Sequence, residues 1–155
     1  MSEQFKNFIN NKWVDPITEK YFESTNPADE TEVLGKFASS GTQDANLAIN
    51  SAYDSFSSWS KMSQIQRGDF LYKASSWLEE NSERYAEAIT KECGKSIAEA
   101  QGEVGRSVAL LRYYAAQGSD PVGNVVPSVN ANILLYTTRV PLGVVGLITP
   151  WNFPL

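Results

Sequence analysis

The chain has 155 residues, of which 42% are hydrophobic and 20% charged, and its net charge is -5. This composition is typical of a folded domain, and an acidic chain without basic clusters is a poor partner for nucleic acid or an anionic membrane. A single cysteine, Cys93, excludes an internal disulfide, and a sequence without histidine excludes His-based metal sites and Ser-His-Asp triads within the chain. The polar N-terminus is unlike a signal peptide and no run reaches the length of a membrane span, so we expect a cytoplasmic protein.

The first part of the chain predicts short strands joined by tight turns. The segment FINNKWV at 8–14 predicts a small hairpin, because its two central asparagines tolerate the positive φ angles of a two-residue turn. Residues 21–24 and 32–39 predict two further strands, which the turn signal NPAD at 26–29 separates.

The middle of the chain changes to a helical period. Ser63 and Ser96, each followed three residues later by Gln or Glu, form capping boxes that predict helix starts. Ser82 opens a further helix, which Gly94 is expected to end. Core packing is the best explanation for the apolar faces. Their predicted members are Ala45, Ala48, Ile49, Ala52, Phe56 and Trp59; Phe70, Leu71, Ala74, Trp77 and Leu78; Tyr85, Ala86 and Ile89; and Ile97, Ala100, Val104, Val108, Leu111 and Ala115.

The last part predicts a loop at 120–127 and an extended arm at 132–140 with little sign of a buried face. After a break at 141–143, the run VVGLIT at 144–149 predicts a strand buried on both faces, as at the centre of a parallel sheet. Parallel neighbours need crossover connections, and none follows. We therefore interpret the chain as one portion of a larger α/β protein. Ligands of such sheets bind beyond the carboxyl ends of the strands, where residues 150–152 follow.

Two nucleotide-binding motifs are missing from the sequence. The GKS at 94–96 ends like a phosphate-binding loop, but Ile89 stands where that loop needs its first glycine, and no G-x-G-x-x-G occurs. Cys93 stands at the predicted end of a helix and is interpreted as a structural thiol. By composition alone, Asn152 is a loop residue that satisfies backbone groups.

The stretch RVPLGVVGLITPWNFPL at 139–155 closely resembles the aldehyde dehydrogenase superfamily, because it matches the pattern R-x-P-x-G-V-x-G-x-I-x-P-W-N-F-P. The opening FINNKWV, the NPA at 26–28, the ECGK at 92–95 and the LRYYA at 111–115 resemble further motifs of that family in the same order. Asn11 replaces the common glycine, which affects only the turn. The resemblance covers essentially the whole chain but only the first part of the family's architecture.

This resemblance implies an α/β fold, the N-terminal part of the aldehyde dehydrogenase fold. That part is an incomplete Rossmann-like cofactor domain with a β-arm for oligomerisation. Residues 1–121 would be the first segment of the NAD(P)-binding domain, and 122–141 the oligomerisation arm. Residues 142–155 would be the first strand of the dinucleotide-binding sheet and the oxyanion loop. The implied parent enzyme uses NAD or NADP on a small-molecule aldehyde and is a homodimer or homotetramer.

The resemblance also assigns candidate site residues. Asn152 matches the family's oxyanion-hole asparagine, and Phe153 matches a wall of the substrate tunnel. The family's nucleophile and glutamate base lie beyond Leu155, and Cys93 does not match the nucleophile's motif, so the chain alone is expected to be inactive. In the family, one segment lies beside the nicotinamide end of the cofactor. The matching residues of this chain are Ile148, Thr149, Pro150, Trp151 and Asn152.

Two further assignments carry alternatives. Some family members bind a monovalent cation through positions that match the Thr25 backbone and Glu92, and a plain surface carboxylate is the alternative we favour for Glu92. Arg106 points away from the buried face of its helix and matches a position at the mouth of the substrate tunnel. There it would pair with a distal carboxylate, and a solvated surface arginine is the alternative. Its helix and residues 139–143 look most similar to the semialdehyde branch, which implies a carboxylate-bearing aldehyde as substrate.

Other classes of function remain open at this point. A non-catalytic assembly module could keep the arm and pair with a full-length partner, since exposed β-arms seek strand partners. A stand-alone nucleotide-binding domain is a third possibility, but one sheet strand without a phosphate loop argues against it. The reading frame downstream of Leu155 separates these classes, because an in-frame cysteine motif would favour a portion of an enzyme.

Overall fold

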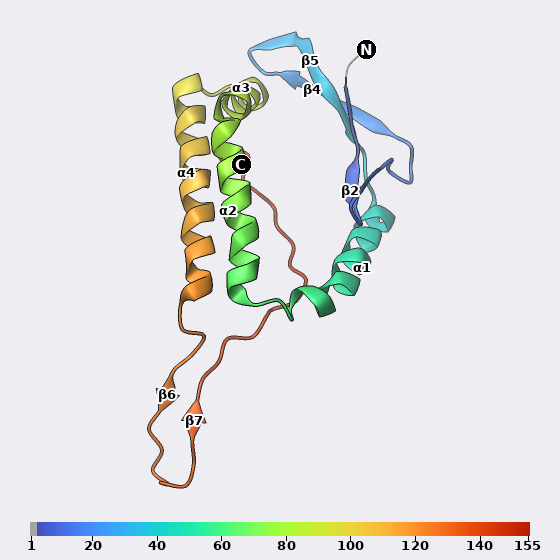
Figure 1. The fold of residues 1–155 in the computed structure, drawn as a ribbon. Helices are drawn as coiled ribbons and strands as arrows, with labels where there is room; N and C mark the ends of the chain where they lie inside the picture. The colour runs from blue at the N-terminus through green and yellow to red at the C-terminus, as the bar shows by residue number, and fades with distance from the viewer. Residues whose placement is uncertain (1–2) are drawn as a thin grey trace.

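A computed structural model describes residues 3–155 of the chain (Figure 1). Strands come first, four helices follow, and a long hairpin precedes the last segment. Figure 1 shows the last three helices packed together, the two strands within 21–38 beside the third helix, the first helix set apart from the bundle, and the hairpin projecting from the body. Within residues 3–155, no helix is both long enough and apolar enough to cross a membrane.

The N-terminal strands form a three-stranded sheet and a separate hairpin. The sheet has the order β1-β5-β4, in which β1 runs parallel to β5 and β4 runs antiparallel to it. In the hairpin of β2 and β3, Asn10 and Asn11 adopt φ angles of 49° and 61°, which confirms the predicted turn. The strands are β1 (Gln4–Phe5), β2 (Asn7–Ile9), β3 (Lys12–Val14), β4 (Tyr21–Asn26) and β5 (Asp29–Ala38).

The four predicted helices are present, and both capping boxes are confirmed. Ser63 Oγ accepts the Gln66 amide at 3.2 Å, and Ser96 Oγ accepts the Glu99 amide at 3.3 Å. Gly94 ends its helix with φ of 74°, a left-handed conformation that glycine adopts without strain. The helices are α1 (Thr42–Trp59), α2 (Gln64–Glu80), α3 (Ser82–Cys93) and α4 (Ile97–Ala116).

The apolar core lies between α2, α3 and α4. It confirms the predicted inward faces of α3 and α4, except that Ile97 is exposed. The helices α2 and α4 approach closely at Gly68, where a Cβ would meet the Ala115 carbonyl oxygen at 2.6 Å. The buried core residues are Leu78, Ala86, Ile89, Ala100, Val104 and Val108.

The predicted burial of the α1 stripe is wrong. Phe56 is half-buried, and the best-covered side chain of the helix is Asp44. Among residues 3–155, only the end of the stripe has an aromatic partner on the bundle, where the centre of the Trp59 ring lies 5.5 Å from that of the Phe70 ring of α2, while the rest of α1 lies apart from the α2–α4 bundle (Figure 1). The spacing therefore identified an apolar face but not what covers it. The residues that were predicted to be buried and are exposed are Ala45, Ala48, Ile49, Ala52 and Trp59 on α1, and Phe70, Ala74 and Trp77 on α2.

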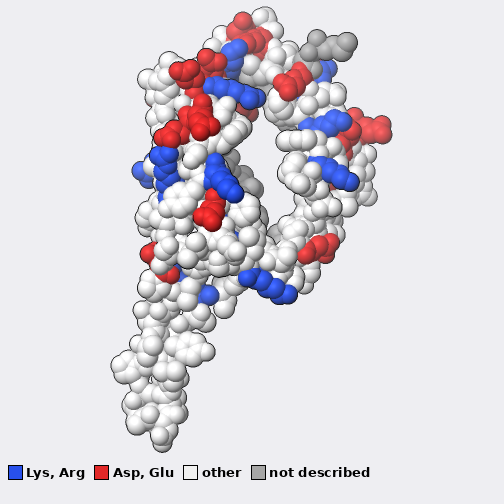
Figure 2. Space-filling view, viewed as in Figure 1, with Lys and Arg blue, Asp and Glu red and all other residues white. Residues whose placement is uncertain are grey.

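The hairpin joins β6 (Val125–Val126) to the antiparallel β7 (Leu135–Tyr136). The expected loop at 120–127 thus contains a strand, which pairs with the predicted extended arm. At Gly123 the two backbones are so close that a Cβ would clash with the Thr137 carbonyl, which requires glycine there. Residues 121–138 carry no charged side chain, and Figure 2 shows the hairpin uncoloured beneath a body covered with both signs of charge.

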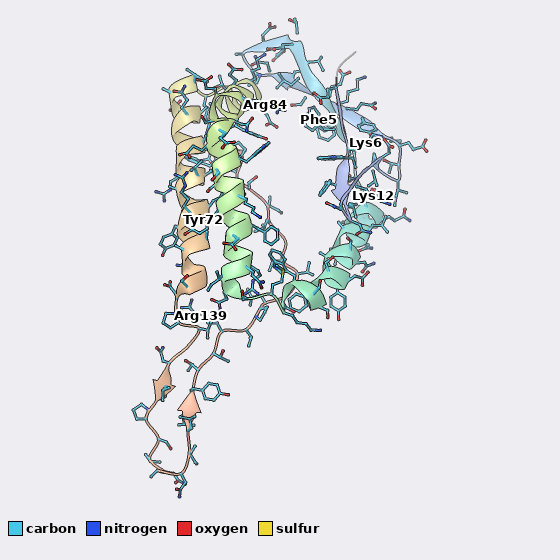
Figure 3. All side chains as sticks on the ribbon, in the orientation of Figure 1. Phe5, Lys6, Lys12, Tyr72, Arg84 and Arg139 are labelled. Carbon is cyan, nitrogen blue, oxygen red and sulfur yellow. The ribbon has the colours of Figure 1, made fainter. Side chains whose placement is uncertain are left out.

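The predicted strand at 144–149 does not form among residues 3–155. Leu147 and Ile148 are 88% and 99% exposed. A central strand needs hydrogen-bonding neighbours on both sides, and the described residues supply none to this segment. Instead the chain runs past the base of the bundle, where Figure 3 labels Arg139, and returns along it toward α3 (Figures 1 and 3).

Candidate functional site

The segment 150–155 ends the chain as a turn that rests on the junction of α3 and α4. The Phe153 amide donates to the Pro150 carbonyl oxygen at 3.1 Å, which closes the turn. The backbone of this PWNFPL segment then contacts side chains from both helices and from the link between them. Residues far apart in the sequence therefore meet at this position, which lies at the end of the apolar run 144–149.

Lys95 is the first contact of the turn. It lies in the short link between α3 and α4, and its Nζ donates to the Asn152 carbonyl oxygen at 2.7 Å. The same Nζ forms an ion pair with Glu103 Oε2 at 2.6 Å and lies 4.7 Å from the centre of the Phe153 ring. A cation over an aromatic face is attracted by the ring's quadrupole, so Lys95 holds the turn by two kinds of interaction.

Glu103 is the second contact. Its Oε1 accepts the backbone amide of Leu155 at 3.0 Å, while its Oε2 takes the ammonium of Lys95. The side chain is 2% exposed, and that of Lys95 is 16% exposed. Sequence reasoning did not identify this pair as part of the site. The available signal was Glu103 itself, a carboxylate between Ala100 and Val104 on the buried face of α4.

Cys93 faces the same turn. Its Sγ lies 3.6 Å from the Trp151 carbonyl oxygen, as expected for a thiol that donates a weak hydrogen bond. Burial, and next the negative charge of Glu92, raises the pKa of the Cys93 thiol. A raised pKa disfavours the thiolate, the reactive form of cysteine. These features support the interpretation of Cys93 as a structural thiol.

The predicted oxyanion and cofactor residues lie consecutively on an open surface. Asn152 is held through its backbone while the residue remains exposed, and no hydrogen bond of its side-chain amide is present within residues 3–155. Trp151 and Phe153 are 87% and 57% exposed. Residues 148–152 are all exposed, and the side-chain amide of Asn152 has no partner among the described residues, so their assignment to a ligand site stays a prediction.

Arg106 lies on α4, one helical turn beyond Glu103, and is exposed as predicted. The adjacent Gly102 borders open space, so another element or a ligand can approach this face of the helix closely. Arg106 forms no salt bridge to any residue of the described 3–155 chain. Arg106 thus lies exposed on the helix that carries the turn, without an ion pair among the described residues.

The two predicted cation positions lie on neighbouring elements. Thr25 sits at an irregularity of β4, where the pairing with β5 shifts register on both sides, and α3, which carries Glu92 near its end, packs against β4. Within residues 3–155, no three carboxylate, histidine or cysteine side chains gather as a metal site. That finding does not test a cation held by a backbone oxygen, so the Thr25 and Glu92 assignment stays a prediction.

Comparison with known sequences identifies the family. The sequence model of the aldehyde dehydrogenase family matches residues 13–155. This chain belongs to the aldehyde dehydrogenase family. The match includes the docked PWNFPL turn and the Lys95–Glu103 pair beneath it, so the contacts described above are those of an aldehyde dehydrogenase chain.

The relatives are several times longer than this aldehyde dehydrogenase chain. The α-ketoglutaric semialdehyde dehydrogenase of Bacillus subtilis is 41% identical over 97% of the chain, and the mitochondrial succinate-semialdehyde dehydrogenase of Arabidopsis thaliana is 37% identical over 95%. The chain spans 31% and 28% of their lengths.

Solved structures share the fold. An NAD-dependent aldehyde dehydrogenase from Sinorhizobium meliloti is 29% identical and superimposes over 99% of this chain and 31% of its own, with a TM-score of 0.92. An NADP-dependent enzyme from E. coli, also 29% identical, gives a TM-score of 0.92 over 99% of this chain and 31% of its own. The α/β fold class is thereby confirmed, as an N-terminal part of the aldehyde dehydrogenase fold.

Proposed function

We propose that the chain is the N-terminal portion of an NAD(P)-dependent aldehyde dehydrogenase, which oxidises an aldehyde to a carboxylic acid. The observation that carries the proposal is the PWNFPL turn, anchored by its backbone with the exposed Asn152 at its centre. In this proposal residues 1–121 belong to the NAD(P)-binding domain and 122–141 to the oligomerisation arm. Residues 142–155 supply the first strand of the dinucleotide sheet once its neighbours are present.

Asn152 would stabilise negative charge in the reaction. When a nucleophile attacks an aldehyde, the carbonyl oxygen becomes an oxyanion, and a fixed donor that points at it lowers the barrier. The side-chain NH₂ of Asn152 is a neutral donor that no pH change removes. Bound NAD(P) supplies the hydride acceptor. The exposed residues 148–152 fit such a coenzyme as one wall of its site and require the rest of the enzyme to complete it.

The proposed substrate carries a carboxylate at the end remote from the aldehyde. Arg106 supports this, because an exposed guanidinium without an ion pair in the described chain is free to bind a carboxylate through two parallel hydrogen bonds. The names of the Bacillus subtilis and Arabidopsis thaliana relatives, both semialdehyde dehydrogenases, point to the same class. Phe153, exposed beside Asn152, is proposed to form a wall of the substrate tunnel.

We further propose a homodimer or homotetramer located in the cytoplasm. The uncharged, exposed β6–β7 hairpin supports association, because its short strands leave backbone groups available to another chain. The same hairpin favours the alternative function, an assembly module that pairs with a full-length partner without catalysis. An open reading frame that continues past Leu155 to a cysteine motif would support the enzyme, and a stop codon there would support the module.

The proposal is tested by Asn152→Ala in the whole enzyme. We expect kcat to fall by roughly 10²–10³ with an unchanged coenzyme Kd, as for other lost oxyanion donors. Asn50→Ala, which replaces an exposed asparagine of α1, is the matched control. A kcat close to that of the wild type, measured where chemistry limits turnover, would remove Asn152 from the oxyanion site.

A further inference from the structure

We propose that Lys95 and Glu103 are positioning residues for Asn152. They clamp the turn at the two backbone atoms that bracket the Asn152–Leu155 segment. This proposal rests on the proposed function, since it concerns how that asparagine is presented. The clamp itself is a feature of the chain and can be measured without any reaction.

Each of the two side chains holds a different backbone atom of the turn. Lys95 Nζ fixes the carbonyl oxygen of Asn152 at 2.7 Å, and Glu103 Oε1 fixes the amide of Leu155 at 3.0 Å. Lys95 and Glu103 then hold each other at 2.6 Å. Because the peptide unit after Asn152 is held, the position from which its side chain projects is restricted. The clamp therefore limits where the side-chain amide can lie, through contacts that the amide does not make itself.

The burial of the Lys95–Glu103 pair indicates a role other than stabilising the fold. Taking an ammonium and a carboxylate out of water costs free energy, and a buried ion pair is often replaceable by apolar residues without loss of stability. Within residues 3–155, each hydrogen bond and ion pair of the Glu103 side chain goes either to Lys95 or to the turn. The contacts of Lys95 likewise go to Glu103 or to the turn, including the Phe153 ring. Placement of the turn is the function that these contacts share.

A second lysine ion pair provides the matched control. Lys91 forms an ion pair with Glu32 at the same 2.6 Å, on the last turn of α3, one helical turn before Lys95. Its side chain is 53% exposed and contacts β5 instead of the turn. Lys91→Met therefore removes a lysine charge and an ion pair of equal length while leaving residues 150–155 untouched.

The first experiment measures amide hydrogen exchange in this chain by NMR. Lys95→Met with Glu103→Met leaves neither a buried charge nor a side-chain acceptor for the Leu155 amide, and it should raise exchange at Leu155 and Phe153 by about tenfold or more relative to the core amides of Val104 and Val108. Lys91→Met should change none of these four. Unchanged exchange at Leu155 in the double variant would overturn the clamp. If the core amides accelerate equally, the pair is only structural and the proposal is also overturned.

The second experiment separates positioning from plain stability in the whole enzyme. The double variant should lower kcat by about tenfold with an unchanged coenzyme Kd, and the same change should add little to Asn152→Ala, because both act on one donor. Fully additive losses would overturn the positioning role. If Asn152→Ala itself has no effect on kcat, the proposed function fails, whereas the exchange result still decides whether the clamp exists.

Discussion

The side chain of Asp44 accepts a hydrogen bond from the amide of Ile17 at 2.9 Å, although the two residues lie 27 positions apart. Its second oxygen accepts the Gly41 amide at 2.9 Å, at the start of α1. The carboxylate also lies where the helix dipole favours negative charge. One buried side chain therefore joins the turn after β3 to the first helix, in a region whose apolar faces are mostly uncovered.

Replacing Asp44 by Asn is expected to destabilise the chain at neutral pH. Hydrogen bonds from the amides of Gly41 and then of Ile17 lower the pKa of the Asp44 carboxyl below its usual value. A depressed folded-state pKa stabilises the fold above the unfolded pKa, and this contribution is lost as the pH falls through the folded value. The stability gap between wild type and Asp44→Asn should thus be present at about pH 7 and smaller at about pH 2.

Urea unfolding followed by circular dichroism at the two pH values measures this gap. Asp54→Asn is the control, because Asp54 is an exposed carboxylate of the same helix. Equal midpoints for wild type and Asp44→Asn at neutral pH would show that the link between Ile17 and α1 adds nothing to stability.

Replacing Gly94 or Gly102 by alanine should change the free energy of unfolding in opposite directions. Gly94 has φ of 74°, and a Cβ there would lie 3.1 Å from Pro27 Cγ, so Gly94→Ala should cost about 1–2 kcal/mol of unfolding free energy. Gly102 lies within α4 and borders open space, so Gly102→Ala should stabilise by about 0.5–1 kcal/mol. Thermal unfolding of the two variants checks the pair. A stabilising Gly94→Ala would contradict the link between this glycine and the end of α3.

Local signals predicted the elements better than they predicted burial. Asn10, Ser63 and Ser96 each satisfy nearby backbone groups or adopt a special φ, so their effects are readable from adjacent residues. Most of the α1 stripe and the run 144–149 depend on partners that the described residues do not supply. The Lys95–Glu103 contact escaped prediction for a related reason, because an ion pair that anchors a turn more than 45 residues away leaves no periodic pattern.

The chain should self-associate through residues 144–149. Leu147 and Ile148 are 88% and 99% exposed in an apolar segment without a strand partner in the described chain, and such segments template association. Leu147→Lys with Ile148→Lys should therefore shift the chain toward monomer in sedimentation velocity or light scattering. Val129→Lys at the hairpin is the control. If only the Val129 variant disperses the assembly, the hairpin is the associating surface and the assembly-module alternative gains support.

Arg106→Ala should discriminate between substrates in the whole enzyme. Arg106 is exposed on the helix that anchors the turn, and Gly102 leaves the approach to that face open. A hydrogen bond to a charged group contributes about 1.5–3 kcal/mol, so loss of the guanidinium should raise KM for a carboxylate-bearing semialdehyde by about tenfold or more. The KM for an uncharged aldehyde of similar length should be almost unaffected.

Two control variants sharpen this test. Arg106→Lys should recover part of the loss, because it restores the charge without the two parallel hydrogen bonds of a guanidinium. Arg84→Ala, which removes an exposed arginine of α3, controls for a general change in surface charge. Equal effects of Arg106→Ala on both aldehydes would make Arg106 a structural residue and remove the main support for a carboxylate-bearing substrate.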